Sequence, residues 1–262
     1  MKTRIIVSVT IIILTILALL VGLGSNNDEG IKIGFVTTLS TGSQAIGIDM
    51  QDAFDLAIEH LNGEMAGIEV KVYYEDDGFD PDLGRQKTER LVTLDKVDFV
   101  TGYIWSNVLL ASYKAATDND VFVISANAGP SQLAGKDCTK NFFSVSWQND
   151  QTPMAMGEVL NKRGIKNLYL LAPNYSAGRN MVAGVRRTYS GEIVASELTQ
   201  WPGQLDFSAE LAKIRAANPE AVWVFYPGNH GTQFFTQYAQ AGLLGKIPLY
   251  SQHSYENTSY YS

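Results

Sequence analysis

The chain has 262 residues, 45% of them hydrophobic, which is enough for one large or two modest domains with a buried core. Twenty basic residues against 27 acidic ones give a formal net charge of −7. Because the basic residues are scattered and form no stripe that could neutralise phosphates, the composition argues against a nucleic-acid partner.

The N-terminus has the pattern of an export signal. Lys2 and Arg4 precede an uncharged apolar run from Ile5 to Gly24, and the polar stretch NNDE follows soon after it. We expect a signal peptide over residues 1–24, cleaved after Gly24. The run also approaches the roughly 20 apolar residues that span a bilayer, so an uncleaved membrane anchor is the alternative. In both cases the charge pattern predicts that the remainder lies outside the cytoplasm, in the periplasm or the extracellular space.

From Ile31 onward, short β-rich runs alternate with amphipathic helical runs. In the first series the predicted strands cover 31–39, 68–75, 97–102 and 121–125, and the helices between them cover 48–62, 82–94 and 107–119. After the strand-like run 141–147 the pattern resumes, with helices over 148–164, 176–189, 208–218 and 232–242 and strands over 166–173, 192–200, 221–228 and 247–250. Repeated βα units predict parallel sheets with helices on both faces. Because the two series meet near 141–151, we expect two lobes, an N-terminal one over 30–143 and a C-terminal one over 144–262.

The segments that follow the predicted strands have a common composition. In open parallel sheets, ligands bind beyond the carboxyl ends of the strands. The segments there are 40–44, 102–107, 125–132, 173–178 and 227–231, which are rich in Gly, Ser, Asn, Tyr and Trp and poor in ionisable groups. Such a composition is typical of a site that holds a ligand through N–H groups, hydroxyls and aromatic faces, and not of one that performs acid–base chemistry.

Sequence patterns of enzymes and metal sites are missing. There is no Gly-x-Ser-x-Gly motif and no phosphate-binding loop, and the histidines at 60, 230 and 253 have no zinc-ligand spacing. The acidic stretch EDDGFDPD at 75–82 lacks EF-hand spacing, and we interpret it as a solvated turn in which Asp82 caps the next helix. The single cysteine, Cys138, is interpreted as a passive thiol. We therefore expect a binding protein without a metal or a cofactor, and not an enzyme.

Several segments together are similar to those of a known family. The chain contains, in this order, LSTGSQAIG, VYYEDDGFDP, TGYIWSN, VFVISANAGPSQL, NFFSVSWQND, LLAPNYSAGRNM and VWVFYPG. In order and spacing they resemble the periplasmic type I solute-binding proteins of branched-chain amino acid (Leu/Ile/Val-type) ABC transporters. ANAGPSQLAG, SWQNDQ and LLAPNY are most similar to the branch that binds aromatic carboxylates. The resemblance implies a two-lobed fold that closes by a hinge on a small carboxylate, with an ABC permease as partner.

The resemblance also assigns roles to residues by position. It implies that the hydroxyl and backbone of Ser106 hold the ligand's carboxylate, and that backbone groups of Asn127 and Ala128 reach the same ligand. Gly129 stands where the amino-acid binders have a hydroxyl residue that helps to hold the ammonium, and His253 falls near the position of their ammonium-binding Glu. Both departures favour an aromatic acid over a branched-chain amino acid, because an ammonium without acceptors in a closed cleft is costly.

The residues themselves support a carboxylate ligand with an apolar body. The helix predicted after Trp105 begins near Ser106, and N–H groups at a helix start can hold an anion without a lysine or arginine. Trp105 and Phe79 stand where relatives carry a disulfide pair, so we expect the two rings to pack in its place. Aromatic rings near strand ends can face a ligand, although core packing is the competing interpretation and is favoured for Tyr103 and Tyr226. The candidate set is completed by Trp147, Tyr175, Ser40 and Asn229.

Members of the family continue beyond the point where this chain ends, so the resemblance implies that the second lobe is incomplete. The expected function is that of a monomeric solute-binding protein for import. Two alternatives stay open. One is a ligand-sensing domain of the same fold, tethered by an uncleaved apolar segment. The other is an exported hydrolase in which Ser106 or Ser131 is activated by a distant histidine.

Overall fold

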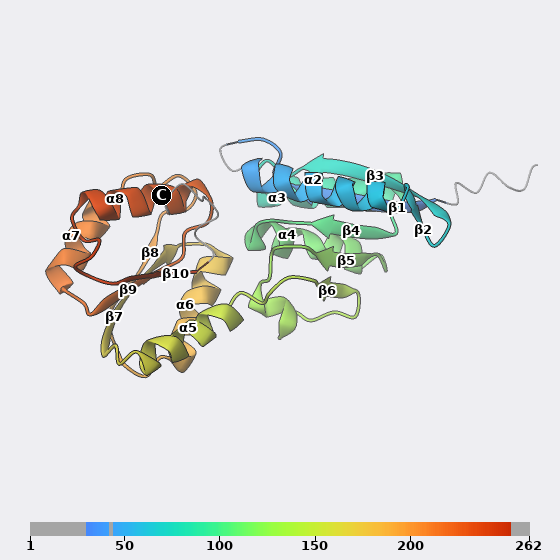
Figure 1. Ribbon diagram of the computed structural model, residues 1–262. Coiled ribbons are helices and arrows are strands. Elements are labelled where there is room, and N and C mark those ends of the chain that lie inside the picture. Colours follow the sequence, from blue (N-terminus) through green and yellow to red (C-terminus); the bar gives the residue numbers. More distant parts are fainter. Residues whose placement is uncertain (1–29, 42–43, 253–262) are drawn as a thin grey trace, which may run out of the picture.

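The computed structural model describes residues 30–41 and 44–252, so the predicted signal segment and His253 lie outside the described residues. Two sheets form two lobes that lie side by side (Figure 1). The two-lobed α/β fold expected from the sequence is confirmed, including its parallel sheets.

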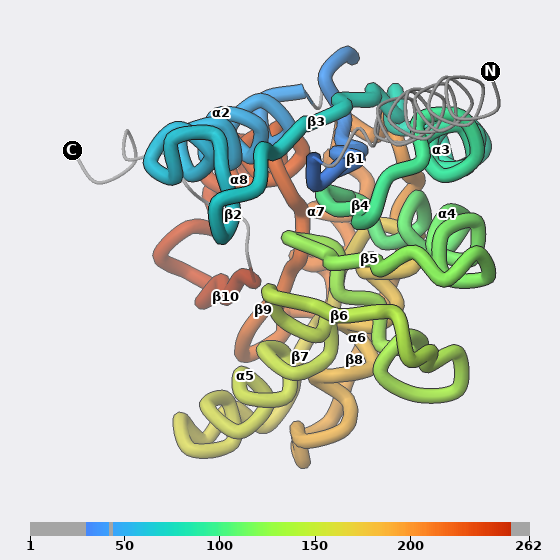
Figure 2. Tube along the Cα trace, turned by 90° about the vertical axis from the view of Figure 1, so that its right-hand side faces the viewer, coloured from blue at the N-terminus to red at the C-terminus, as the bar shows by residue number. Residues whose placement is uncertain are grey.

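The first lobe is built on a six-stranded sheet with the order β2-β3-β1-β4-β5-β6. Its strands are β1 (Ile31–Thr37), β2 (Glu64–Met65), β3 (Ile68–Asp76), β4 (Phe99–Gly102), β5 (Phe122–Ser125) and β6 (Phe142–Ser144). Every neighbouring pair is parallel except β2 and β3. The helices are α2 (Gln44–His60), α3 (Pro81–Arg90) and α4 (Ser106–Thr117), with a π-helical turn η1 (Leu91–Asp95) and a 3₁₀ turn η2 (Ser131–Ala134). Figure 2 shows α2 on one face of this sheet and α3 and α4 on the other.

The second lobe is built on a four-stranded parallel sheet with the order β10-β9-β7-β8. Its strands are β7 (Asn167–Pro173), β8 (Glu192–Thr199), β9 (Ala221–Val224) and β10 (Leu249–Ser251), and its helices are α5 (Gln151–Lys162), α6 (Ser176–Thr188), α7 (Ser208–Ala217) and α8 (Asn229–Gln240). The chain enters this lobe after β6 through residues 145–150, within the region where the two predicted series meet.

Strand β7 shows how the second sheet is buried on both faces. Leu168 and Leu170 belong to one core cluster, whereas Tyr169 and Leu171 belong to the other. Because successive side chains of a strand point to opposite faces, one apolar run supplies both cores. The first of these clusters also contains residues of the first lobe, so one apolar core continues from lobe to lobe.

Some local predictions were wrong. Helix α2 begins at Gln44, before the start predicted at residue 48, and the helix predicted over 82–94 is α-helical only to Arg90. The cap of α3 is Asp80, whose carboxylate accepts from Asp82 N and Leu83 N, and not Asp82. Asp77, in the turn interpreted as solvated, is completely buried. These are places where a tertiary contact or a neighbouring side chain overrides the local pattern.

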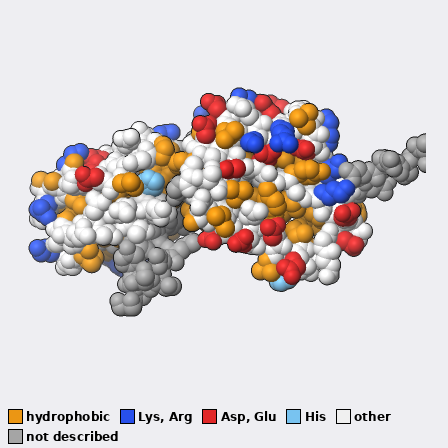
Figure 3. Space-filling view, turned by 90° about the horizontal axis from the view of Figure 1, so that it is seen from above, with side chains coloured by type: hydrophobic (Ala, Val, Ile, Leu, Met, Phe, Trp, Pro, Cys, Tyr) orange, Lys and Arg blue, Asp and Glu red, His pale blue; other side chains and the backbone are white. Residues whose placement is uncertain are grey.

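Among the described residues, none of the helices combines the length and the apolar character needed to cross a bilayer. On the face seen in Figure 3, acidic and basic side chains are interspersed. Such a face offers no continuous basic stripe of the kind that binds nucleic acid.

Both sheets have a point where the strand order reverses. In the first sheet the order reverses between the neighbouring strands β1 and β4, because the chain continues from β1 to β3 on one side and from β4 to β5 on the other. In the second sheet it reverses between β7 and β9, which are flanked by β8 and β10. Loops that leave such neighbouring strands diverge and leave a crevice, which is the usual ligand position in open α/β sheets. The segments after β4, β7 and β9 are therefore where a site is expected.

Candidate ligand-binding site between the lobes

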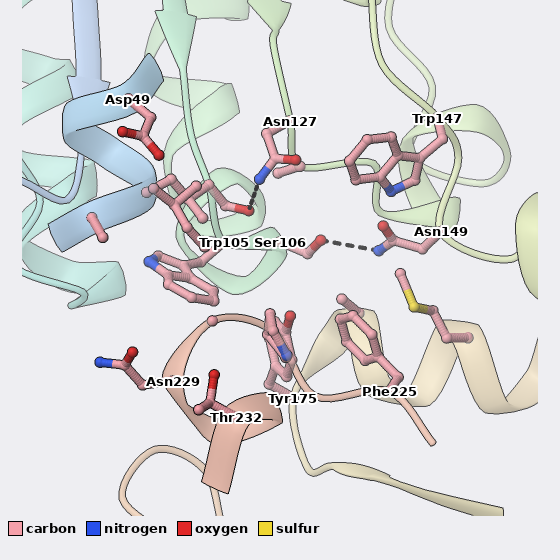
Figure 4. Close-up of a pocket in the computed structure, with 18 residues that line it drawn as sticks. Asp49, Trp105, Ser106, Asn127, Trp147, Asn149, Tyr175, Phe225, Asn229 and Thr232 are labelled. Atoms are coloured by element: carbon pink, nitrogen blue, oxygen red, sulfur yellow. Dashed lines mark hydrogen bonds between the residues drawn. The ribbon is translucent and has the colours of Figure 1, made fainter. Parts of the chain in front are cut away.

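A cavity of about 480 Å³ lies between the two lobes at these strand ends. The first lobe contributes Ala45, Ile46, Asp49, Ile104, Trp105, Ser106, Asn127 and Ala128, and the second contributes Tyr175, Ala177, Met181, Phe225, Pro227, Gly228, Asn229 and Thr232. Trp147 and Asn149, from the segment that crosses between the lobes, complete the lining. Figure 4 shows Tyr175 and Phe225 facing the first-lobe residues across the cavity. A volume in this range suits a small organic ligand.

Seven of the nine residues predicted for the site line this cavity. They are Trp105, Ser106, Asn127, Ala128, Trp147, Tyr175 and Asn229. The other two, Ser40 and Gly129, lie outside its lining. The assignment of any of these residues to a bound ligand stays a prediction.

Three helices begin at the cavity without a capping side chain. The N-cap residues are Trp105 for α4, Tyr175 for α6 and Gly228 for α8, and none of them makes a side-chain cap hydrogen bond. In α4 the first backbone bond runs from Leu109 N to Trp105 O at 3.0 Å, so the preceding N–H groups have no partner within the helix. Open N–H groups and the positive ends of three helix dipoles favour an anion here.

Among the described residues, no basic side chain lines the cavity. Asp49 on α2 is the single charged residue among those that line it, and it is exposed. In Figure 4 it lies on the α2 side, away from the hydrogen bond between Ser106 and Asn149. The hydroxyl of Tyr175 stays neutral because burial raises its pKa. An anionic ligand would therefore be held by backbone and hydroxyl donors and not by an ion pair.

Ser106 is the first residue of α4 and is almost fully buried at the cavity wall. Its Oγ accepts a hydrogen bond from Asn149 Nδ2 at 3.0 Å, and among the described residues no acceptor takes its own hydroxyl proton. Asn149 is held in turn by its N–H, which donates to Gly129 O at 2.7 Å. The serine can thus donate to a carboxylate while its orientation is fixed from behind. The helix start expected at Ser106 is confirmed.

Asn127 and Ala128 differ in what they can offer a ligand. Asn127 is half-buried and donates from Nδ2 to Ile104 O at 3.4 Å, a long bond that leaves its side-chain oxygen as an acceptor. Ala128 N already donates to Tyr103 O at 2.9 Å, and Ala128 O accepts from Ser125 Oγ at 2.5 Å. The N–H of Ala128 is therefore already paired within the protein, whereas its carbonyl oxygen keeps a second lone pair for a ligand. A backbone contact of Ala128 with a ligand stays a prediction.

Gly129 lies behind the cavity wall, against the segment that crosses between the lobes. A Cβ at this position would lie 1.8 Å from the carbonyl oxygen of Trp147. No side chain fits there without moving the segment that carries Trp147 and Asn149. A hydroxyl residue at this position, as in the amino-acid binders, is incompatible with the present packing.

Ser40 lies at the exposed end of the loop after β1. It hydrogen-bonds the carboxylate of Asp76, which also accepts from Leu39 N at 2.9 Å and Gly78 N at 2.9 Å. Burial raises the pKa of Asp76, but these hydrogen bonds outweigh it and hold the pKa below its usual value. Ser40 thus fixes the loop and does not reach the cavity.

The aromatic wall extends across both lobes. The Phe79 and Trp105 rings lie 4.5 Å apart in an edge arrangement, which confirms the packing expected where relatives carry a disulfide. Tyr175 stacks on Trp201 at 4.9 Å, and Trp201 also contacts Trp105 at 5.6 Å. Trp201 was not predicted for the site. It follows an edge strand, and the only sequence feature that marks it is its place before the Pro202-Gly203 turn. The cluster gives the cavity an apolar, polarisable side.

The remaining sequence candidates lie in other places. Tyr103 and Tyr226 are buried in the core and bond to Thr88 Oγ1 at 2.7 Å and Thr199 Oγ1 at 2.9 Å. The eleven residues that line the cavity and were not predicted for the site are Ala45, Ile46, Asp49, Ile104, Asn149, Ala177, Met181, Phe225, Pro227, Gly228 and Thr232. Asp49 and Thr232 lie outside the segments quoted from the sequence, whereas Asn149, Met181 and Phe225 lie within them. Within the described residues no cluster of His, Cys, Asp or Glu is suited to a metal ion.

Comparison with known proteins agrees with this architecture. The sequence profile of the family described as periplasmic binding protein matches residues 30–259. A curated relative, the Leu/Ile/Val-binding protein homolog 3 of Brucella melitensis, is 23% identical over 232 residues, which cover 86% of this chain and 60% of the relative.

Two solved structures are similar over the same extent. A solute-binding protein of an ABC transporter from R. palustris, in complex with benzoate, has a TM-score of 0.80 at 27% identity and covers 85% of this chain and 62% of that chain. The branched-chain amino acid transporter substrate-binding protein of Streptococcus pneumoniae, in complex with isoleucine, has a TM-score of 0.76 at 27% identity, with coverage of 85% and 64%. The chain thus spans about 60% of the length of the curated relative. From its sequence and its two-lobed fold, the chain belongs to the periplasmic binding protein family.

Proposed function

We propose that this chain is an extracytoplasmic solute-binding protein of an ABC transporter. It captures a small carboxylate between its lobes, an aromatic acid in preference to a branched-chain amino acid, and presents it to a membrane permease. The observation that carries the proposal is the cavity at which three uncapped helices begin beside an aromatic wall. These features complement the two parts of an aromatic acid, its charge and its ring.

The choice of an aromatic acid rests on where acceptors are placed. An α-amino acid carries its ammonium next to its carboxylate, so the acceptors must lie beside the carboxylate site. Gly129, behind that part of the wall, has no room for a hydroxyl side chain, and Asp49 lies on the α2 side of the cavity. An ammonium near Ser106 would have amide oxygens as acceptors but no carboxylate, and its desolvation would be poorly compensated.

The family and the N-terminal sequence support the proposed location and partner. A basic start, an apolar segment and a polar continuation support export to the periplasm or the extracellular space. A monomer that opens and closes on its ligand is the form such delivery needs. If the mature N-terminus is Ser25, the transporter role is favoured over the tethered sensor.

A hydrolase is not supported by the cavity. Ser106 bonds to Asn149, an amide that cannot take its proton, and none of the histidines in the described part of the chain lines the cavity. Ester turnover that disappears in Ser106→Ala would contradict the present proposal.

Isothermal titration calorimetry with benzoate, cinnamate, leucine, isoleucine and valine tests the ligand class. We expect saturable binding of the two aromatic acids and weaker or no binding of the three amino acids. Tighter binding of the amino acids would overturn the preference, and no binding of any of the five would overturn the ligand class.

A further inference from the structure

A chain of buried hydrogen bonds runs from the acidic turn 76–80 to the cavity wall. The indole Nε1 of Trp105 donates to Thr38 Oγ1 at 2.9 Å, and Thr38 Oγ1 donates to Asp77 Oδ1 at 2.6 Å. All three side chains are at most 2% exposed. An indole N–H can only donate and a carboxylate can only accept, so the direction of both bonds is fixed by chemistry. Bonds that run in one direction in a low dielectric strengthen one another.

The burial of Asp77 needs an explanation. No salt bridge to it is found within the described residues, its Oδ2 has no hydrogen-bond partner there, and Phe79 N is the only other donor to Oδ1, at 2.9 Å. A buried carboxylate without a cation is costly, and burial accordingly raises the pKa of Asp77. A residue that violates a local rule in this way is commonly kept for a site and not for stability.

The far end of the chain of bonds is a residue with two functions in the cavity. Trp105 is the N-cap residue of α4, so its position determines where Ser106 and the first N–H groups of the helix point. Its ring also contacts Tyr175 at 6.3 Å and Trp201 at 5.6 Å, both from the second lobe. An indole that is free to turn would disturb the carboxylate end and the aromatic wall together. Thr38 and Asp77 themselves do not line the cavity.

We propose that Asp77 is a positioning residue for this site, which acts through Thr38 to fix the indole of Trp105 and the start of α4. The bonds exist without ligand, and their effect on affinity rests on the proposed function. A purely structural role in the turn would require only the bond from Phe79 N, and would leave the indole unaffected when Asp77 is replaced by leucine.

The test compares Thr38→Val, which removes the hydroxyl at nearly constant shape, with Thr38→Ser, which keeps it. The readouts are the ¹H–¹⁵N resonance of the Trp105 indole, assigned through Trp105→Phe, and benzoate affinity by calorimetry. We expect Thr38→Val to shift the indole resonance and to weaken benzoate binding about tenfold, the effect of one hydrogen bond of ordinary strength, and Thr38→Ser to restore both. Asp77→Asn keeps an acceptor oxygen and is expected to behave like Thr38→Ser, whereas Asp77→Leu is expected to behave like Thr38→Val.

An unshifted indole resonance in Thr38→Val would overturn the proposal, as would a shifted resonance with unchanged benzoate affinity. If the unmodified chain binds no carboxylate, the proposed function fails, and the positioning role is judged by the indole resonance alone. If Thr38→Val does not fold, hydrogen exchange of the indole N–H in the unmodified chain decides. Exchange as fast as that of the half-buried Trp147 would contradict a fixed indole.

Discussion

Replacement of Ser106 by alanine is the sharpest test of the carboxylate end of the cavity. The change removes one hydroxyl at the first position of α4 and leaves the helix and its open N–H groups in place. A hydrogen bond to a charged group contributes about 1.5–3 kcal/mol. Its loss should therefore weaken benzoate binding by about 10- to 150-fold without abolishing it.

The effect on folding should be small. The variant loses the bond from Asn149 Nδ2 to Ser106 Oγ, a neutral bond that contributes about 1 kcal/mol, while Asn149 keeps its contact with Asn180 Oδ1 at 3.4 Å. The assay is calorimetry of benzoate binding, with thermal unfolding measured on the same preparations.

Ser112 supplies a matched control on the same helix. It is buried, its Oγ has no hydrogen-bond partner among the described residues, and it does not line the cavity. Ser112→Ala should leave benzoate affinity unchanged. Equal binding by Ser106→Ala and the unmodified chain, or equal losses in the two variants, would refute a specific contact between Ser106 and the carboxylate.

The remaining predictions concern packing and pH. Gly129→Ser should destabilise the protein by about 1–3 kcal/mol in urea unfolding, because any Cβ at this position meets the carbonyl of Trp147. The control Ala126→Ser, on the exposed part of the same loop, should leave the free energy of unfolding unchanged. Equal stability of the two variants would contradict this packing. Burial lowers the pKa of His230 from 6.5, so the folded state binds the proton less tightly than the unfolded state, and the stability of the protein should fall as pH drops below that value. His230→Gln should remove this part of the acid sensitivity. Identical pH profiles of the melting temperature for the variant and the unmodified chain would count against this prediction. Burial raises the pKa of Asp77 above 3.8, so the contribution of its protonated form to stability is present below that value and is lost as pH rises through the raised pKa. Asp77→Asn should therefore gain stability relative to the unmodified chain as pH rises. A difference in stability between the two proteins that does not change with pH would contradict the assignment.

The order of strands and helices could be predicted because it depends on hydrophobic periods that are local in sequence. The start of α4 at Ser106 is one such feature, since it requires only a strand end followed by a helical pattern. The strand-end rule also led to Asn127 and Tyr175, which line the cavity. It also led to Ser40, which hydrogen-bonds Asp76 and is not among the described residues that line the cavity.

Features that depend on contacts between distant segments could not be predicted. An acidic run such as that around Asp77 is typical of a solvated turn, and its burial follows only from the packing of Thr38 and Trp105 over it. Trp201, which follows the edge strand of the other lobe, packs on the lining residues Trp105 and Tyr175. The pairing of the Ala128 N–H likewise depends on the turn at Tyr103, which no local pattern reveals.

The central claim is that helix N-termini and a serine hydroxyl hold the charge of a carboxylate in a cavity whose described lining contains no basic residue. Parallel calorimetric titrations with benzoate and with benzamide, its neutral counterpart of nearly the same shape, test this claim most directly. We predict saturable binding of benzoate and at least about tenfold weaker binding of benzamide, because the amide presents no negative charge to the helix N-termini. Equal affinity for the two compounds would contradict the account.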